Sequence, residues 1–210
     1  MKCLALLILF VSTCLSSWAQ AGEWTISPAK NPDGTTYSGN VSIKKQGDTY
    51  TIHWKTSKGN PEGIGVLNNN ILYAGYSPEP SYGVTVYDVK DGNLVGIRTT
   101  NTGQSGSEGV AGANRLVGTY DVKGQTANGT TYTGSITIAR NGSVFNCTWE
   151  VGSDTYEGVG ILEGRKFIAS WAKGSGAGLM IYRFEPNAAM GTWAVQGNNK
   201  WGYENLVRSN

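Results

Sequence analysis

Apolar and polar residues alternate with a period of two along short stretches of the chain. Tyr50, Ile52 and Trp54 share one face of residues 49–55, and residues 144–150 repeat the same alternation. A period of two with one apolar face is typical of an antiparallel sheet that buries one side. No stretch sustains the period of 3.6 that a helix requires. The pattern therefore predicts an all-β protein.

Clusters of Gly, Asn, Asp and Pro separate these stretches, for example at 31–34, 46–48, 58–61 and 68–70. These residue types adopt turn conformations at low cost. The spacing of the clusters predicts eight short strands in each half of the chain. Eight consecutive strands leave two open edges unless the sheet closes on itself. We therefore expect two tandem eight-stranded antiparallel up-and-down β-barrels of the calycin-like kind, with a β-sandwich as the alternative.

The chain contains an internal sequence repeat. A shift of 95 positions places Gly-Thr-Thr-Tyr-Ser-Gly (34–39) on Gly-Thr-Thr-Tyr-Thr-Gly (129–134). The same shift places Trp54 on Trp149, and Glu-Gly-Ile-Gly-Val-Leu at 62–67 on Glu-Gly-Val-Gly-Ile-Leu at 157–162. Self-similarity at a fixed offset indicates duplicated structural units. The expected organisation is a leader at 1–21, a first barrel repeat at 22–113 and a second at 114–210.

The first 21 residues have the pattern of a signal peptide. A basic start, Met1-Lys2, precedes an apolar run at 4–11, and a small-residue cleavage pattern ends at Ala21. The apolar run is too short to cross a bilayer, and no second run follows it. The sequence predicts export to the periplasm or the exterior, with no membrane insertion after cleavage.

Removal of this leader would leave a single cysteine. Cys3 and Cys14 lie within the leader, so Cys147 has no partner for an internal disulfide. Cys147 shares a strand face with Phe145 and Trp149. The pattern favours a buried, inert thiol over a nucleophile.

Composition narrows the classes of partner and cofactor. Lys plus Arg number 17 and Asp plus Glu 15, giving a formal net charge of +2. This near-neutral balance gives no broad basic surface of the kind that binds nucleic acid. His53 is the single histidine, so a multi-histidine metal centre is excluded within one chain. We expect no metal and no cofactor.

The order of motifs resembles a known group. Combined over the two repeats, the order is Gly-Thr-Tyr (118–120), Asp-Gly-Thr-Thr-Tyr (33–37), a tryptophan, Gly-x-Gly, a tyrosine and Gly-Thr-Trp (191–193). This order resembles uncharacterised exported bacterial proteins, some of which carry a fibronectin-binding label. The strand meander is also similar to the lipocalin and avidin barrels, a resemblance that implies a small ligand in the lumen. No biotin-site pattern is present.

The longer loops of each repeat fall at one end of the expected barrel and define a mouth. Aromatic and acidic side chains gather there in both repeats, a lining that suits a sugar or a small cation. The candidate ligand-binding residues are Tyr37, Trp54, Glu62, Tyr76 and Glu108 in the first repeat, and Tyr132, Trp149, Glu157, Trp171, Trp193 and Glu204 in the second.

Three functions remain open at this point. The first is a non-enzymatic protein whose barrels each hold a small apolar or sugar-like ligand at the mouth. The second is an adhesion module with filled barrels that binds an extracellular protein, because aromatic residues are also common core filler. The third is a hydrolase using a carboxylate pair such as Glu62 and Glu108. The sequence contains no Gly-x-Ser-x-Gly elbow and no zinc-ligand spacing, so no catalytic residue is assigned.

Overall fold

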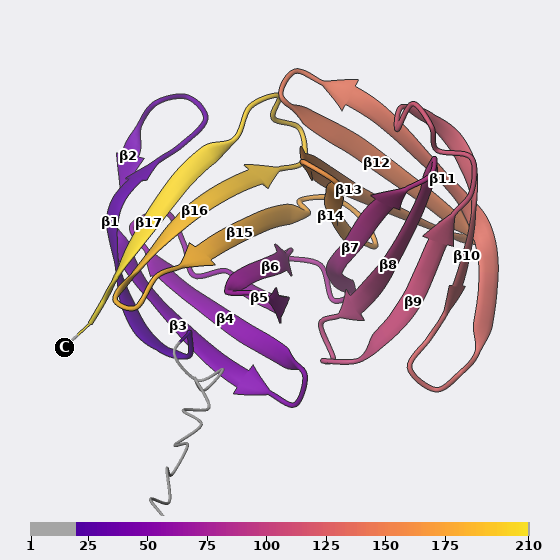
Figure 1. Cartoon of the computed structure of the whole chain (residues 1–210). Coiled ribbons are helices and arrows are strands. Elements are labelled where there is room, and N and C mark those ends of the chain that lie inside the picture. The colour runs from indigo at the N-terminus through magenta and orange to yellow at the C-terminus, as the bar shows by residue number, and fades with distance from the viewer. Residues whose placement is uncertain (1–19, 210) are drawn as a thin grey trace, which may run out of the picture.

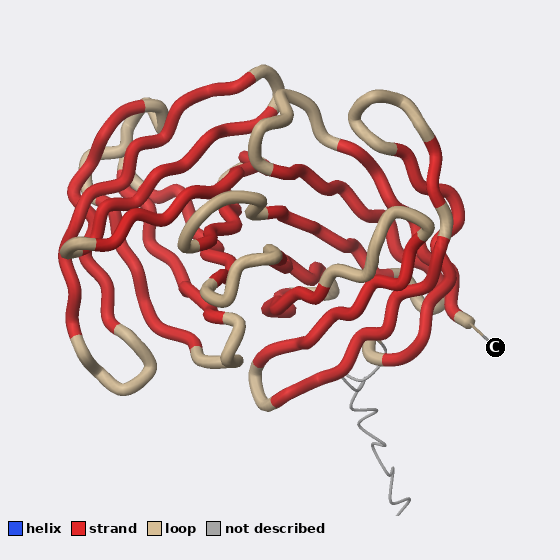
Figure 2. Tube along the Cα trace, turned by 180° about the vertical axis from the view of Figure 1, so that it is seen from behind, coloured by secondary structure: helices blue, strands red, loops and turns tan. Residues whose placement is uncertain are grey.

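The computed structural model describes residues 20–209, which contain seventeen β-strands joined by turns and loops. These residues include no helix long and apolar enough to cross a membrane. Figure 2 shows the trace as strands and connecting loops throughout. The predicted all-β class is confirmed. Most of the predicted leader, residues 1–19, lies outside the described residues.

Eight strands close into a first cylinder, named barrel A here, and a short ninth strand, β2, pairs with β1 at its rim. The sheet closes where β17 pairs with β1. Its strands are β1 (Gly22–Lys30), β2 (Thr36–Tyr37), β3 (Gly39–Gln46), β4 (Thr49–Thr56), β5 (Glu62–Asn68), β6 (Ile71–Tyr76), β15 (Gly178–Phe184), β16 (Ala188–Val195) and β17 (Gly202–Arg208).

The remaining eight strands close into a second cylinder, barrel B. Here β9 pairs with β10, and β14 pairs with β7. Its strands are β7 (Tyr82–Lys90), β8 (Asn93–Thr100), β9 (Ser105–Val110), β10 (Gly118–Gln125), β11 (Thr131–Asn141), β12 (Val144–Val151), β13 (Asp154–Glu163) and β14 (Lys166–Ala172). The prediction of two closed eight-stranded antiparallel barrels is confirmed.

The strands are nevertheless distributed differently from the expected division into repeats. The boundary at residues 113 and 114 does not separate the barrels, because each repeat contributes its last three strands to the other barrel. In Figure 1 the orange-gold to yellow strands β15–β17 lie beside strands of the indigo to purple N-terminal part, and β7–β9 lie beside β10 and β14. Since the repeats are homologous, β7 and β15 present similar pairing edges, and an exchange of equivalent elements costs little.

Two linkers carry the chain between the barrels, residues 77–81 after β6 and residues 173–177 after β14. They contact each other where they cross: the Lys173 amide donates to the Ser81 carbonyl over 2.8 Å, and the Ser77 hydroxyl donates to the Ser175 carbonyl over 3.4 Å. At this crossing β6 pairs with β15 instead of continuing into a hairpin with β7. The crossing therefore decides which strands complete each barrel.

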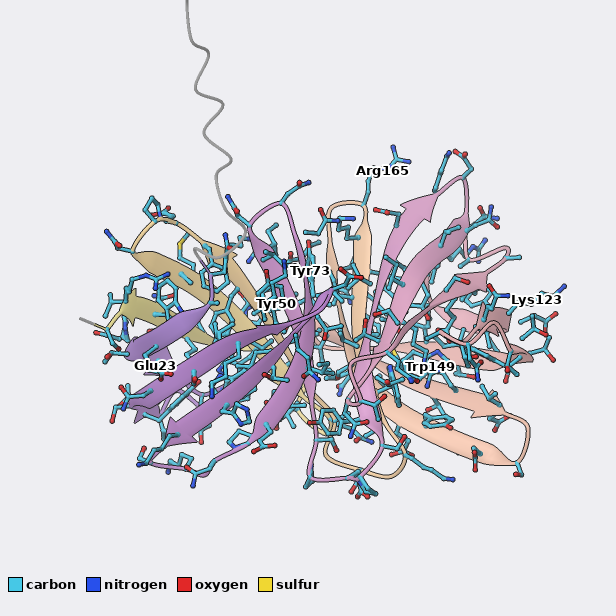
Figure 3. The ribbon with its side chains drawn as sticks, turned by 90° about the horizontal axis from the view of Figure 1, so that it is seen from below. Glu23, Tyr50, Tyr73, Lys123, Trp149 and Arg165 are labelled. Carbon is cyan, nitrogen blue, oxygen red and sulfur yellow. The ribbon has the colours of Figure 1, made fainter. Side chains whose placement is uncertain are left out.

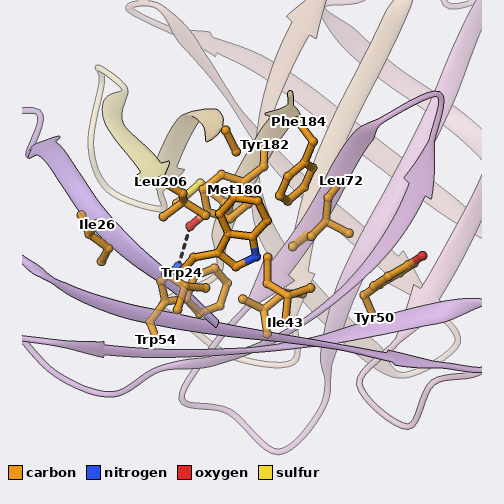
Figure 4. Packing of buried hydrophobic residues seen from close by; sticks show 14 of the residues in the cluster. Trp24, Ile26, Ile43, Tyr50, Trp54, Leu72, Met180, Tyr182, Phe184 and Leu206 are labelled. Atoms are coloured by element: carbon orange, nitrogen blue, oxygen red, sulfur yellow. Dashed lines mark hydrogen bonds between the residues drawn. The ribbon is translucent and has the colours of Figure 1, made fainter. Parts of the chain in front are cut away.

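The inward faces of both barrels are packed with apolar and aromatic side chains. Figure 4 shows Trp24, Ile43, Leu72 and other residues of β1, β3 and β6 meeting inside barrel A. Bulky rings fit there because glycines face them: a Cβ added at Gly63 would lie 2.8 Å from the Trp54 ring. The Gly-x-Gly motif thus provides close packing between strands.

The outward face of the same strands forms an interface between the barrels. Tyr73 and Ile181 of barrel A pack with Val84, Val159 and Ile168 of barrel B in one buried cluster. Figure 3 shows Tyr73 between the two barrels and Trp149 within barrel B. Strands at this junction are therefore buried on both faces, unlike the one-sided sheet expected from alternation.

The end of the predicted leader contacts barrel A. Gln20 is buried, and its side-chain amide donates to Asn70 Oδ1 over 2.9 Å. The Gln20 carbonyl accepts a 3.1 Å hydrogen bond from the Trp24 indole. Cleavage after Ala21 would remove these partners of Asn70 and Trp24.

The exchange predicts that the two repeats stay together after the chain is cut between them. A protease site inserted after Gly112, an exposed position in the β9–β10 connection, separates residues 22–112 from the rest on cleavage. We expect the fragments to co-elute in size-exclusion chromatography in 1 M urea, because both barrels need strands from both repeats. Elution as two independent species would contradict the exchanged topology.

Candidate functional site

A buried glutamate lies at the mouth of barrel A. Glu204, on β17, is almost fully buried and accepts three hydrogen bonds from aromatic side chains. The Tyr37 hydroxyl donates to Oε2 over 2.7 Å, and the Trp54 indole donates to Oε1 over 3.1 Å. The Tyr182 hydroxyl also donates to Oε1. The Trp54 N–H is shared with the Tyr182 oxygen at 2.9 Å, the contact marked in Figure 4.

Barrel B contains the same arrangement around Glu108 on β9. The Tyr132 hydroxyl donates to Oε2 over 2.6 Å, and the Trp149 indole donates to Oε1 over 3.1 Å. The Tyr87 hydroxyl donates to Oε1 as well. Each donor in barrel B occupies the repeat-equivalent position of a donor in barrel A. The two mouths are therefore built on one plan.

Burial changes the acidity of these groups. Removal from water raises the pKa of Glu204, although the hydrogen bonds from Tyr182, Tyr37 and Trp54 act in the opposite direction. Burial, and next the charge of Glu204, raise the pKa of Tyr182 well above its ordinary value. Burial and the charge of Glu108 do the same for the pKa of Tyr87. The tyrosines therefore stay protonated and act as donors.

A cation completes the site in barrel B. Arg98 Nη1 donates to Glu108 Oε2 over 3.2 Å, and the arginine side chain is 13% exposed. Its guanidinium carbon lies 3.9 Å from the Trp171 ring centroid, 5.1 Å from Tyr156 and 5.8 Å from Tyr132. Burial acts to lower the pKa of Arg98, but the charge of Glu108 and the interactions with Tyr132 and Tyr87 together outweigh it, and the pKa is raised. Arg98 is thus a charged group held in an aromatic cage.

Barrel A has an aromatic residue where barrel B has this cation. The repeat offset of 95 places Trp193 at the position of Arg98. The Trp193 ring lies 6.3 Å from the Tyr37 ring, and the Trp54 and Tyr76 rings are 5.5 Å apart. Among the described residues, Glu204 forms no ion pair. The two mouths differ most at this position.

A cavity opens at each mouth, above the packed centre of the barrel. The cavity of barrel A has a volume of about 150 Å³ and reaches Glu204. Its aromatic walls are Tyr37, Trp54, Tyr76 and Trp193. The cavity of barrel B is about 320 Å³, and Arg98, Tyr132, Tyr156 and Trp171 are among its lining residues. Arg98 lies between that cavity and Glu108.

Nine of the eleven candidate residues meet at the two mouths, but in a different grouping from the one expected. Glu204 and Trp193 of the second repeat join the first repeat's aromatic residues, and Glu108 of the first repeat joins those of the second, because the last three strands are exchanged. The group in barrel A is Tyr37, Trp54, Tyr76, Trp193 and Glu204, and the group in barrel B is Glu108, Tyr132, Trp149 and Trp171.

The structure places the other two candidates, Glu62 and Glu157, outside the mouths. The side chain of Glu62 is 69% exposed, and its Oε1 lies 3.1 Å from Nδ1 of His53. Glu157 accepts a hydrogen bond from Gln196, which links barrel B to barrel A. Both residues precede an inward-facing glycine, so alternation turns their side chains outward. Glu62 and Glu108 lie in different barrels, and the carboxylate pair expected for a hydrolase is not formed.

Arg98 and Tyr156 of barrel B, and Met180 of barrel A, were not predicted as site residues. A usable signal was present for Arg98, because it continues the inward alternation of Leu94 and Gly96 on β8. Cys147 is buried inside barrel B as expected, and burial raises the pKa of its thiol. Residues 20–209 contain no cluster of His, Cys, Asp and Glu suited to a metal ion.

Comparison with known proteins provides no functional assignment. No family model matches the chain, and no curated protein matches it. Among solved structures, it is similar to a DUF3598-family protein of unknown function from Nostoc punctiforme, with 10% identity over 90% of this chain and 95% of that one. The TM-score of that match is 0.20, too low to support any argument.

Removing the cation should destabilise barrel B. Arg98→Ala leaves Glu108 buried without its ion-pair partner, a change that costs about 3–5 kcal/mol in comparable buried pairs. We expect a loss of that order in the free energy of unfolding measured with urea. Arg115→Ala, in the exposed β9–β10 connection, is the matched control and should change stability by less than about 0.5 kcal/mol. Equal effects of the two substitutions would contradict a stabilising role for Arg98.

The pH dependence of stability should report the burial of Glu204. Because its pKa is raised in the folded state, protonation of Glu204 favours folding. This contribution is complete below the ordinary value of 4.5 and is lost as the pH rises through the raised value. Glu204→Gln lacks the titration, so we expect the wild type to lose stability relative to this variant as the pH rises above 4.5.

The measurement is urea unfolding of both proteins over a pH series. Glu185→Gln, at an exposed position on the β15–β16 turn, is the control and should show no such trend relative to the wild type. A difference between Glu204→Gln and the wild type that stays constant with pH would show that the carboxyl group is not perturbed by burial.

Proposed function

We propose that this chain is an exported, non-enzymatic protein that binds a small ligand at the mouth of barrel A. The observation that supports this proposal is the cavity of about 150 Å³ with aromatic walls that ends on the buried carboxylate of Glu204. Small-molecule sites are typically concave, largely apolar and equipped with a few fixed polar groups. The mouth of barrel A has each of these properties.

The aromatic rings at this mouth are available for contact. Tyr37, Tyr76 and Trp193 are each partly exposed and line the cavity, whereas Trp54 lies deeper. The Glu204 carboxylate is held in position by three donors, so a ligand meets a preorganised acceptor. Preorganisation lowers the entropic cost of binding.

The size of the cavity limits what can enter. The cavity of barrel A is about 150 Å³, whereas pockets for drug-sized ligands usually measure ~300–1,000 Å³. The volume of this cavity fits a small molecule or one end of a larger one. A small ligand at the centre of the lumen, the position implied by the lipocalin and avidin resemblance, is not part of this proposal, because Trp24, Ile43 and Leu72 fill the centre of the barrel.

The outer surface of barrel B favours a second candidate function, binding to another protein. Arg98 already occupies the aromatic cage at the mouth of barrel B. The outer surface of barrel B exposes two apolar side chains on β8, Val95 at 61% and Ile97 at 54%. Exposed apolar side chains in a row are typical of contact surfaces. A protein-interaction role for barrel B is therefore the second candidate function.

Ligand binding at barrel A is tested by tryptophan fluorescence and calorimetry with a panel of small sugars, amines, carboxylates and neutral amides. We expect at least one class to bind saturably and to change the fluorescence. Trp193→Ala should weaken that binding at least tenfold, because it removes one wall of the cavity. Trp201→Ala, at an exposed loop position outside the cavity, is the matched control and should leave binding unchanged.

Two results would overturn this proposal. One is the absence of saturable binding by every class in the panel. The other is binding that survives Trp193→Ala unchanged, which would place the ligand elsewhere on the protein.

A further inference from the structure

We propose that the ligand of barrel A carries a guanidinium group, which binds where the Arg98 guanidinium lies in barrel B. This inference rests on the proposed function and names the chemical class of its ligand. The argument is an internal comparison, because the protein contains two copies of one mouth and one copy holds its cation within the chain.

The positions compared are equivalent in the fold and in the sequence. Arg98 pairs with Thr85 on β7 and with Gly106 on β9. Trp193 pairs with Met180 on β15 and with Gly202 on β17. Both residues therefore lie on the middle one of the three exchanged strands, and their pairing positions on that strand are equivalent. The side chain at this position points toward the buried glutamate in barrel B.

The two carboxylates differ in one acceptor site. Glu108 Oε2 accepts from Tyr132 and from Arg98, whereas Glu204 Oε2 accepts from Tyr37 alone among the described residues. Each carboxylate oxygen has two lone pairs. Glu204 Oε2 therefore keeps an acceptor site that corresponds to the one filled by Arg98 in barrel B, and the cavity of barrel A reaches this residue.

The aromatic walls are also retained. Tyr76 stands at the repeat position of Trp171, and Tyr37 stands at that of Tyr132. In barrel B these positions face the guanidinium within 3.9 and 5.8 Å of its carbon. The face of an aromatic ring attracts a cation, most strongly where water is excluded. Barrel A thus keeps two walls of the cage.

The lining of the two mouths differs at two positions of the cage. Trp193 replaces the tethered cation itself, and Pro61 replaces Tyr156, the third ring of the cage. The cavity of about 150 Å³, which Trp193 and Pro61 both line, accommodates a planar group of guanidinium size. A guanidinium suits this site because one N–H can donate to the open acceptor site of Glu204 Oε2 while the planar group stacks on the aromatic walls.

The charges around the mouth of barrel A limit the ligand further. Lys58 lines the cavity at its exposed rim, and its charge interacts with that of Asp33. Glu204 provides the negative charge at the base, and Tyr37, Tyr76 and Tyr182 are neutral donors or walls. Lys58 disfavours a second positive charge at the rim. The preferred ligand is therefore a singly charged cation.

The test compares isosteres that differ in charge. Methylguanidinium, its neutral isostere methylurea, acetate and glucose are titrated by calorimetry, and N-acetyl-L-argininamide represents an arginine side chain of a peptide. We expect methylguanidinium to bind at least tenfold more tightly than methylurea. Glu204→Gln should remove this preference, and Lys58→Ala should strengthen cation binding. Binding of the blocked arginine as well would identify a peptide side chain as a possible source of the group.

Two further variants use the pseudo-symmetry as a control. Trp193→Arg should place a tethered guanidinium in barrel A and abolish methylguanidinium binding there. Arg98→Ala should open the cage of barrel B, so that methylguanidinium binds a second site and recovers part of the lost stability. This rescue remains measurable if Glu204→Gln fails to fold, because it concerns the other barrel.

The outcomes separate the two proposals. Equal binding of methylurea, or tighter binding of glucose or acetate at the same Trp193-dependent site, would overturn the guanidinium assignment and leave the proposed binding function standing. Failure of methylguanidinium to rescue Arg98→Ala would also count against the assignment. Absence of binding by every probe and by the wider ligand panel would overturn both.

Discussion

At the mouth of each barrel, a buried glutamate from one repeat accepts hydrogen bonds from aromatic side chains of the other repeat. Glu204 of the second repeat accepts from Tyr37 and Trp54 of the first, and Glu108 of the first accepts from Tyr132 and Trp149 of the second. A carboxylate taken out of water is costly unless donors satisfy it. Because each repeat holds the acceptor for the other's donors, neither site is complete within one repeat.

The exchange of strands makes these two sites interdependent. The linkers at 77–81 and 173–177 cross where β6 pairs with β15 and β14 pairs with β7. The same strands bury their outer faces between the barrels, through residues such as Tyr73 and Ile168. The core of each barrel and the interface between them therefore share the same backbone.

Duplication has preserved the scaffold of the mouth while changing its occupant. The glutamate, the two tyrosines and the tryptophan that hydrogen-bond it are the same in both barrels. Arg98 lies between Glu108 and the cavity of barrel B, whereas the cavity of barrel A, with Trp193 at the equivalent position, reaches Glu204. One position on the middle exchanged strand thus separates a glutamate paired with a cation of the chain from a glutamate that the cavity reaches directly.

The alternation of Tyr50, Ile52 and Trp54 determined strand type and inward face, because a pleated strand turns successive side chains to opposite sides. The duplicated motifs determined that two similar barrels form. The partner strands for β6 were decided by tertiary structure alone, since β7 and β15 are homologous and local pattern does not distinguish them. For the same reason the sequence showed that Glu108 and Glu204 lie near a mouth, while only the folded chain decided which mouth each one completes.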